Sequence, residues 1–499
     1  MFGSLVLFCL VLYIFSFLLG TRRRKNFPPG PMALPIFGNL LEFNAQNPIP
    51  DMNRLARRYG NVYSLLFGSK KVVVLNGYEA LKEALVTKAA DFSTRPEDLM
   101  VRDVVQRKGL GQIETDTMGV VLAANSPLWR DHRRFGLSTL RNFGLGKKAM
   151  EERILQEVQR LEKILEDGVG SIISPIQLFH NLASNVISQV VFGSQYDHNH
   201  SFIKMSIAGI RETTKIVNGP WAMMYDTIPW IRYLPLPFRK AFLNMKNLDV
   251  GTMEIVSEHM KTKVKDEPRD LMDCYLDEME MRGSSSFSEE QLSSFAQDLQ
   301  FAGTDTTSNT LLYAFLCMMA HPHVQERGQQ EIDVVLQGRE EASYEDRHQM
   351  PYMQAVIHET QRIANTVPLS VFHATAKDTE LMGYSIPKGT IIVPNMASVL
   401  SEEGQWKFPH EFNPENFLDD RGEFVKPEAF VPFSIGPRVC LGEGLARMEL
   451  FLVLVTLLRR FQFIWPKNAG EPDLSPVFGL TNSPKPFNLE VRLRGREKT

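Results

Sequence analysis

The sequence predicts a mainly α-helical protein (α+β) with a small β-rich part and one apolar segment at its N-terminus. Helical patterns dominate between residues 79 and 339. Before them, the runs 61–67 and 71–75 flank Gly68, and the β-branched residues of the second run favour a hairpin. Residues 2–19 are almost wholly apolar, and they are treated separately below.

Composition limits the class of protein. The chain has 499 residues, 55 Lys+Arg and 58 Asp+Glu, and its formal net charge is −3. At about 150 residues per domain, this length alone suggests about three domains. A charge so near zero argues against a nucleic-acid-binding protein, which usually carries a basic excess. The 4 cysteines are widely spaced, which excludes a disulfide framework and a CxxC zinc site.

The apolar run 2–19 is just long enough to span a bilayer core of about 30 Å. The basic run 22–25 follows it, whereas a cleavable signal peptide carries its basic residues before the apolar run. Basic flanks stay on the cytosolic side of a membrane. We therefore expect an uncleaved single-span anchor at residues 1–21 with the rest of the chain in the cytosol; a buried core helix is the alternative.

A proline-rich stretch separates this anchor from the body of the protein. Pro28, Pro29 and Pro31 keep the backbone extended and remove hydrogen-bond donors. The sequence thus predicts a basic stop and hinge at residues 22–38, either as a plain linker or as a stiff spacer, and one large body at 39–499.

One predicted helix has an unusual middle. Ser288 and Gln291 have the spacing of a capping box, and no proline follows until Pro322, so the helix should cross most of a domain. The stretch 302–307 nevertheless contains a glycine, an acid and three hydroxyl residues. A surface stripe is one explanation, but the flanking residues are apolar. Residues that disfavour a buried helix, placed inside one, indicate a functional site.

Two further patterns lie in the last third of the chain. Glu359 and Arg362 share one face of an apolar helix at 352–364, where a simple ion pair is the ordinary explanation. Cys440 precedes an amphipathic run at 445–461 and lies beside Arg438. A helix N-terminus and an arginine both lower a thiol pKa, which favours a thiolate. A lone cysteine is usually a core residue, but this setting favours a metal ligand.

Together these motifs resemble the cytochromes P450, and in particular the microsomal animal family 2 that oxidises drugs, steroids and fatty acids. The anchor, the hinge and the length fit this class as well, so that the resemblance covers essentially the whole chain. One departure is Asn416, where an arginine is frequent in the family, and its partnership with the Glu359–Arg362 pair is an open question. The matching motifs are Phe433-x-x-Gly436-x-Arg438-x-Cys440-x-Gly442, Glu359-x-x-Arg362 and Ala302-Gly303-x-Asp305-Thr306-Thr307.

The resemblance implies the cytochrome P450 fold, a large helical domain with a small β-rich lobe, and a haem b cofactor. It makes Cys440 the thiolate ligand of the haem iron. Thr306, with Asp305, would deliver protons to dioxygen, and Gly303 would let the helix approach the haem closely. Glu359 and Arg362 would be structural. The residues expected to bind the haem propionates are Trp129, Arg133, His373 and Arg438.

Position within the family also suggests an apolar substrate pocket, although core packing explains each of its residues about as well. No charged anchor for a substrate stands out, which favours small lipophilic molecules. The predicted pocket residues are Val121, Phe301, Ala302, Val367, Leu369, Val371 and Leu480.

Electrons have to come from another protein, because no GxGxxG motif is present. The resemblance implies NADPH–cytochrome P450 reductase, with cytochrome b5 as an optional second partner, at the endoplasmic reticulum membrane. A basic surface would attract an acidic reductase. Its expected residues are Arg130, Arg133, Arg134, Arg141, Lys147 and Lys148 around Trp129, and Arg438 and Arg447 beside Cys440.

The function implied is a monooxygenase that inserts one oxygen atom into a xenobiotic, fatty acid or steroid. Two alternatives stay open. One is a P450-fold isomerase or dehydratase that needs no reductase, against which the intact Asp305-Thr306 pair argues. The other is a non-catalytic membrane protein that binds haem or lipid.

Overall fold

The computed structural model describes residues 25–106, 119–143, 148–197, 200–264, 267–282, 286–339 and 341–495. The predicted anchor at 1–21 lies outside these residues. None of the helices within the described ranges is long and apolar enough to cross a membrane.

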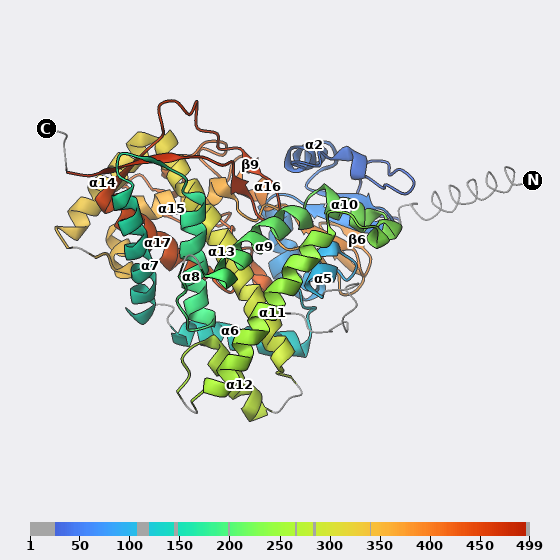
Figure 1. Cartoon of the computed structure of the whole chain (residues 1–499). Helices are drawn as coiled ribbons and strands as arrows, with labels where there is room; N and C mark the ends of the chain where they lie inside the picture. The colour runs from blue at the N-terminus through green and yellow to red at the C-terminus, as the bar shows by residue number, and fades with distance from the viewer. Residues whose placement is uncertain are drawn as a thin grey trace, which may run out of the picture.

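Helices form most of the described chain, with one helix, α13, running through the middle of the molecule (Figure 1). The α-helices are α2 (Ile49–Tyr59), α3 (Tyr78–Lys82), α4 (Ala89–Phe92), α5 (Met100–Val105), α6 (Pro127–Phe143), α7 (Lys148–Asp167), α8 (Ile176–Val191), α9 (Ser201–Val217), α10 (Pro220–Thr227), α11 (Arg239–Thr262), α12 (Leu271–Arg282), α13 (Glu289–Ala320), α14 (Pro322–Leu336), α15 (Pro351–Ala364), α16 (Met396–Leu400) and α17 (Glu443–Arg460). Shorter helical turns are η1 (Leu40–Glu42), η2 (Glu83–Thr87), η3 (Pro229–Tyr233), η4 (Tyr344–Gln349), η5 (Pro414–Phe417) and η6 (Gly436–Arg438).

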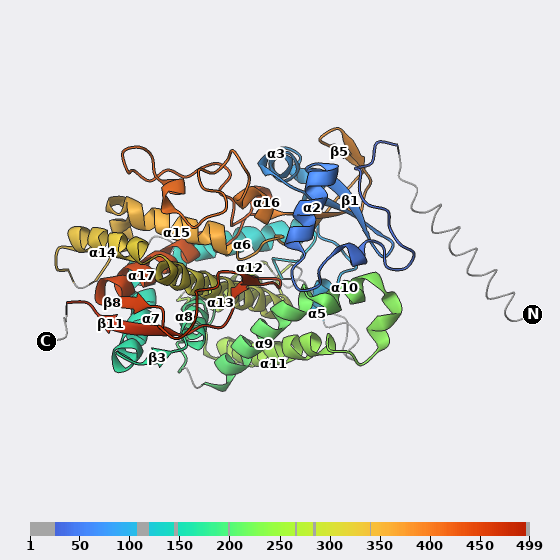
Figure 2. The ribbon, with the colours of Figure 1, turned by 90° about the horizontal axis from the view of Figure 1, so that it is seen from above.

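The strands form small sheets at the edges of the helical body. The strands are β1 (Val62–Phe67), β2 (Lys70–Leu75), β3 (Ile172–Ile173), β4 (His373–Ala374), β5 (Thr379–Leu381), β6 (Tyr384–Ile386), β7 (Ile391–Pro394), β8 (Phe461–Ile464), β9 (Pro476–Val477), β10 (Ser483–Pro484) and β11 (Leu489–Leu493). The largest sheet has the order β1-β2-β7-β4, with β2 and β7 parallel and the other pairs antiparallel. This sheet brings residues near the N-terminus beside a segment some three hundred residues later in the chain, as Figure 2 shows.

The long helix is confirmed as the central element. α13 begins after Ser288, whose hydroxyl accepts the backbone N–H of Gln291, so the predicted N-cap is correct. Most of its side chains are buried, including Leu311 and the run that follows it. Because α8, α11, α15 and α17 pack around α13, most polar side chains in its middle are buried, including Thr304, Asp305 and Thr307.

The Glu359–Arg362 pair is a buried fork and not a surface ion pair. Arg362 Nε and Nη2 each lie 2.7 Å from a different Glu359 carboxylate oxygen, and both residues are at most 2% exposed. Arg362 also donates to the carbonyls of Leu400, Phe408, Pro409 and Glu411. The pair therefore ties α15 to the irregular segment 400–411.

Asn416 takes part in this network, which answers the question raised by the missing arginine. Its amide nitrogen lies 3.2 and 3.3 Å from the two Glu359 oxygens and 3.1 Å from the Phe408 carbonyl. Its amide oxygen accepts the N–H of Phe408 at 2.9 Å. Asn416 thus supplies to Glu359 the donor expected at this position of the family.

Candidate active site

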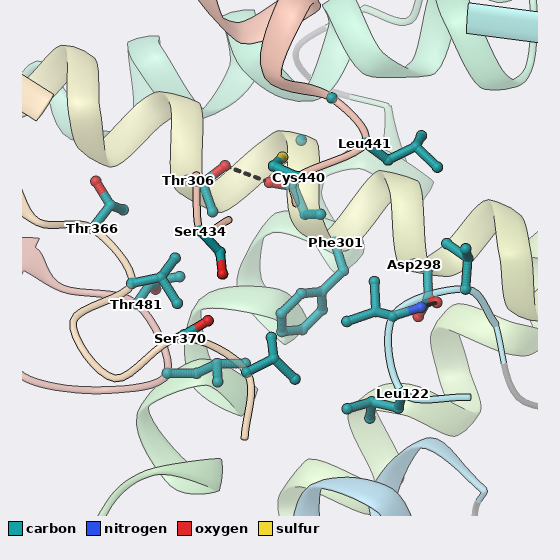
Figure 3. Close-up of a pocket in the computed structure, with 18 of the residues that line it drawn as sticks. Leu122, Asp298, Phe301, Thr306, Thr366, Ser370, Ser434, Cys440, Leu441 and Thr481 are labelled. Carbon is teal, nitrogen blue, oxygen red and sulfur yellow. Dashed lines mark hydrogen bonds between the residues drawn. The ribbon is translucent and has the colours of Figure 1, made fainter. Parts of the chain in front are cut away.

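A cavity of about 370 Å³ lies between the middle of α13 and the loop that precedes α17. Figure 3 shows Phe301 and Thr306 of α13 and Cys440 of the loop on its wall. Segments 119–122, 366–372 and 480–481 close the other sides. Because each wall comes from a different part of the chain, the fold must be complete before the cavity exists.

The cysteine loop is held by close backbone packing. The Cys440 N–H donates to the Phe433 carbonyl at 2.9 Å, and Val439 N–H donates to Gly436 at 3.0 Å. Gly436 has φ +79°, and a Cβ there would meet the Leu85 carbonyl oxygen of η2 at 1.9 Å. Only glycine fits at this position. The loop is therefore clamped against η2, with the Cys440 side chain open to the cavity.

The electrostatics at Cys440 differ from the sequence expectation. Burial raises the pKa of the Cys440 thiol; the backbone N–H groups of Gly442 and Glu443 and the nearby Arg133 oppose that rise. The cation beside the sulfur is Arg133, and not Arg438 as the sequence suggested. The lowering effects of a helix start and an arginine are therefore present as predicted, but burial, which the sequence does not show, outweighs them.

Three of the four arginines that line the cavity form no ion pair with a carboxylate of the described residues. Arg95, Arg133 and Arg438 all line it. Burial, and then repulsion by the neighbouring arginines, lowers the pKa of Arg95 to about 9 and that of Arg438 to about 8. Arg438 is 7% exposed, and its Nη1 has no hydrogen-bond partner. Such a site favours an anionic ligand.

Two of the residues predicted to bind the haem propionates, Trp129 and His373, lie behind these arginines and away from the cavity. The Trp129 indole N–H donates to the Val120 carbonyl at 3.0 Å, and the Trp129 ring supports the Arg438 guanidinium 3.7 Å from the ring centroid. His373 is buried, and its Nδ1 lies 2.7 Å from the Phe92 carbonyl. Burial and the adjacent Arg95 and Arg438 hold the pKa of His373 well below its usual range, so it is neutral. Neither residue is on the cavity surface, in contrast to the expectation.

In the middle of α13 some side chains face the cavity and others face the protein interior behind it. Ala302 and Thr306 face the cavity, and the Thr306 hydroxyl donates to the Ala302 carbonyl at 2.6 Å. Asp305 is 2% exposed and points elsewhere, to His180 and Thr481. Of the two residues predicted to deliver protons together, only Thr306 therefore faces the cavity, because consecutive helix residues point about 100° apart.

Gly303 contributes to the cavity through its backbone. A Cβ added there would meet Ile187 of α8 at 2.8 Å. The missing side chain therefore permits α8 and α13 to pack closely, whereas the sequence suggested close approach of α13 to a haem.

The rest of the cavity wall is largely apolar. Six of the seven predicted pocket residues line it, and the exception is Leu369, which packs in a separate core cluster with Met52 and Leu55. The six are Val121, Phe301, Ala302, Val367, Val371 and Leu480.

Sequence reasoning missed Asp298, a carboxylate on this wall. It accepts the N–H groups of Val120 and Val121, the latter at 2.8 Å. Burial raises the pKa of Asp298 to about 6, and the two N–H groups oppose that rise. Through these two hydrogen bonds Asp298 holds the segment 119–122 against α13.

Arg95 and Thr481 were also missed. Arg95 fixes three carbonyls, of Val121, Val371 and Phe372, with its side chain at 2.7–3.1 Å. Neither residue belongs to a recognisable motif, so that their place at the cavity depends on tertiary contacts alone.

Comparison with known proteins agrees with this arrangement. Residues 28–491 match the family model described as Cytochrome P450. The chain is 42% identical over 481 residues to Cytochrome P450 2D15 of Canis lupus familiaris, covering 95% of each chain. It is 41% identical to the Vitamin D(3) 25-hydroxylase of Sus scrofa, covering 96% of each, and 36% identical to Cytochrome P450 2U1 of Homo sapiens, covering 99% of this chain and 94% of that one.

The large helical body, the small sheets and the thiol-lined cavity define the cytochrome P450 fold. The chain belongs to the cytochrome P450 family, among relatives of its family 2, and is a cytochrome P450 monooxygenase.

This family implies haem iron with a thiolate ligand, and the residues of the cavity fit that group. The side chain of Cys440 is open to the cavity. The unpartnered Nη1 of Arg438 and the two further arginines offer donors and positive charge for carboxylates. The apolar wall fits a hydrophobic macrocycle.

Proposed function

We propose that this protein inserts one atom of dioxygen into small lipophilic substrates such as xenobiotics, fatty acids or steroids, with electrons from NADPH through cytochrome P450 reductase. The observation that carries the proposal is that Cys440 and Thr306 line one largely apolar cavity. When bound, haem b with a thiolate ligand supplies the activation of dioxygen.

The side chains have separate roles in this proposal. Cys440 holds the iron, with its sulfur oriented by the N–H groups of Gly442 and Glu443. Arg95, Arg133 and Arg438 would hold the carboxylates of the haem, whose negative charge would offset the repulsion that lowers the pKa of Arg95 and Arg438. Trp129 and His373 position these arginines from behind. Thr306 holds a proton at its Oγ1 on the cavity wall.

The proposed substrate class follows from the wall. Apolar side chains bind a ligand mainly by burial, at about 25 cal/mol per Å². Asp298 is already bonded to two N–H groups. Burial and the neighbouring Glu157 hold the pKa of Glu449 well above its usual range, so that this lining residue is neutral. These features favour oily molecules, and the hydroxylase name of the pig relative is consistent with such a substrate.

Thr306→Ala should leave haem bound but raise hydrogen peroxide release per NADPH about tenfold. The variant loses the cavity hydroxyl, and a hydrogen bond to a charged group is worth about 1.5–3 kcal/mol. The measurement is NADPH oxidation with reconstituted reductase, with peroxide assay and product mass spectrometry on a lipid and drug panel. Thr306→Ser is the matched control and should couple like the wild type.

The same assay tests the function. Reductase-dependent NADPH use with an oxygenated product supports the monooxygenase. Turnover of a peroxide substrate without NADPH would indicate the isomerase or dehydratase. Absence of both reactions would indicate a binding protein.

For the reductase we propose a docking surface on α6 and the start of α7. Arg130, Arg134, Arg141 and Lys148 are exposed there. The expected set is narrower than the sequence suggested: Arg133 and Arg438 face the cavity, and Arg447 is bonded to Glu443 and His358. Lys147 lies outside the described residues. We propose cytochrome b5 as an optional second partner of this surface.

Reversing two of these charges, Arg134→Glu with Lys148→Glu, should slow reduction by the reductase about tenfold at low salt. Complementary charge accelerates association, and salt screens it. The measurement is stopped-flow reduction at two ionic strengths, where the difference should shrink at high salt. Lys467→Glu, an exposed lysine after β8, is the control. Equal rates for all proteins at low salt would remove this surface from the proposal.

We further propose residues 1–21 as a membrane anchor, 22–38 as a hinge and 39–499 as the catalytic domain, at the endoplasmic reticulum membrane with the catalytic domain in the cytosol. Exposed apolar side chains support the proposed attachment to the membrane. Met32 is 90%, Trp230 64% and Tyr233 82% exposed. Their segments meet the β1–β2 turn, since Gly38 pairs with Phe67 and Gly68 packs against the Thr227 carbonyl. The apolar patch thus lies where residues 32–38, the β1–β2 turn and the segment after α10 come together.

A further inference from the structure

Asp305 has two side-chain partners that the acid–hydroxyl motif on α13 does not predict. The Thr481 hydroxyl donates to Asp305 Oδ2 in a short hydrogen bond, and His180 Nε2 of α8 lies 3.4 Å from Oδ1. All three residues are at most 7% exposed. The carboxylate is therefore enclosed by one imidazole and one hydroxyl.

The orientation of the His180 ring is fixed at both nitrogens. Its Nδ1 lies 2.8 Å from the Ile176 carbonyl of its own helix, so that Nδ1 carries a hydrogen and donates to this carbonyl. This bond turns Nε2 toward Asp305 Oδ1. His180 therefore lies against one oxygen of the carboxylate, and Thr481 bonds to the other.

Thr481 connects this pair to the cavity. It lines the cavity wall, as Figure 3 shows, and donates to Asp305 behind it. Its segment is fixed on both sides, because Leu480 N–H donates to the Thr214 carbonyl at 2.8 Å and Asn482 N–H to the Thr366 carbonyl at 2.7 Å. The Thr306 hydroxyl donates instead to the Ala302 carbonyl.

We propose that His180 and Thr481 are positioning residues for Asp305, and that the Thr481 hydroxyl, and not Thr306, links this carboxylate to the cavity. His180 faces Oδ1, and Thr481 holds Oδ2 toward the wall. The inference rests on the proposed monooxygenase function and adds Asp305 to it, as a carboxylate that supports proton delivery from behind the cavity wall.

The direct test is infrared spectroscopy of the resting holoprotein labelled with ¹³C-aspartate, in which Asp305→Asn identifies the Asp305 band. The band should shift in Thr481→Val, which loses the hydrogen bond at Oδ2, and in His180→Gln, which changes the partner at Oδ1. Thr481→Ser should retain the wild-type position. The matched control is His259→Gln, because His259 has the same arrangement, with Nδ1 2.9 Å from Ile255 O and Nε2 2.9 Å from Asp270 Oδ2.

Coupling with reductase gives the second readout. Thr481→Val should raise peroxide release per NADPH several-fold, Thr481→Ser should restore it, and His259→Gln should leave it unchanged. An Asp305 band that does not move in either Thr481→Val or His180→Gln overturns the inference, as does wild-type coupling in Thr481→Val. The Asp305 band can also move while neither the wild type nor any variant uses NADPH. In that case the contacts of Asp305 are correct, but the proposed monooxygenase function has failed. The positioning role assigned to His180 and Thr481 is then rejected as well.

Discussion

Replacing Arg362 by methionine should destabilise the folded protein by about 3–5 kcal/mol, since this leaves the buried Glu359 carboxylate without its cation. Arg362 joins both Glu359 oxygens and four backbone carbonyls of the segment 400–411. Burial already raises the pKa of Glu359 against the stabilising effect of Arg362. Thermal unfolding and haem content of the purified protein are the measurements.

A matched control is Arg492→Met, which removes an exposed pair with Glu490 at 2.9 Å. Such pairs contribute about 0–1 kcal/mol. Arg362→Lys keeps the charge but loses the fork, and should be intermediate. Equal stability of Arg362→Met and Arg492→Met would contradict the structural role of the pair.

Gly436→Ala should largely abolish haem retention. A Cβ at this position would lie 1.9 Å from the Leu85 carbonyl oxygen and 2.9 Å from its carbon, so the loop or η2 has to move. The loop carries Cys440 four residues later, and its displacement moves the thiol. Overpacking costs about 1–3 kcal/mol, in addition to the strain of a left-handed backbone. Haem content after purification and the unfolding midpoint measure the effect.

The control Gly422→Ala separates the effect of the steric clash from that of the strained left-handed backbone. Gly422 has φ +78°, and a Cβ there meets nothing within 4 Å. This control therefore carries the backbone strain, about 1–2 kcal/mol, without the clash. If Gly436→Ala retained haem as well as Gly422→Ala does, the packing of the loop against η2 would not determine the position of Cys440.

The elements with a clear local pattern could be predicted from the sequence. The hairpin at 61–75, the cap at Ser288 and the helix around Glu359 are confirmed in type and nearly in extent. The motif segments around Thr306 and Cys440 meet at one cavity. Length alone suggested three domains, whereas the family model spans residues 28–491 as one unit.

The directions of side chains could not be predicted in the same way. Asp305 and Thr306 are adjacent in sequence but face different surroundings, and Leu369 packs away from the pocket. Burial raises the pKa of Cys440 because the loop is enclosed, a property that depends on segments remote in sequence. Arg95 and Thr481 reach the cavity from segments without a motif. In each case tertiary packing, and not local chemistry, determines the role.

The central claim, that Cys440 is the thiolate ligand of haem iron in a monooxygenase, is tested most directly by the carbon monoxide difference spectrum of the reduced protein. We expect the wild type to give the red-shifted absorption band that a thiolate ligand produces, and Cys440→Ser to lose it. Cys317→Ser, at a buried cysteine of α13, should retain the band. Absence of this band in the wild type, or its persistence in Cys440→Ser, would contradict the claim.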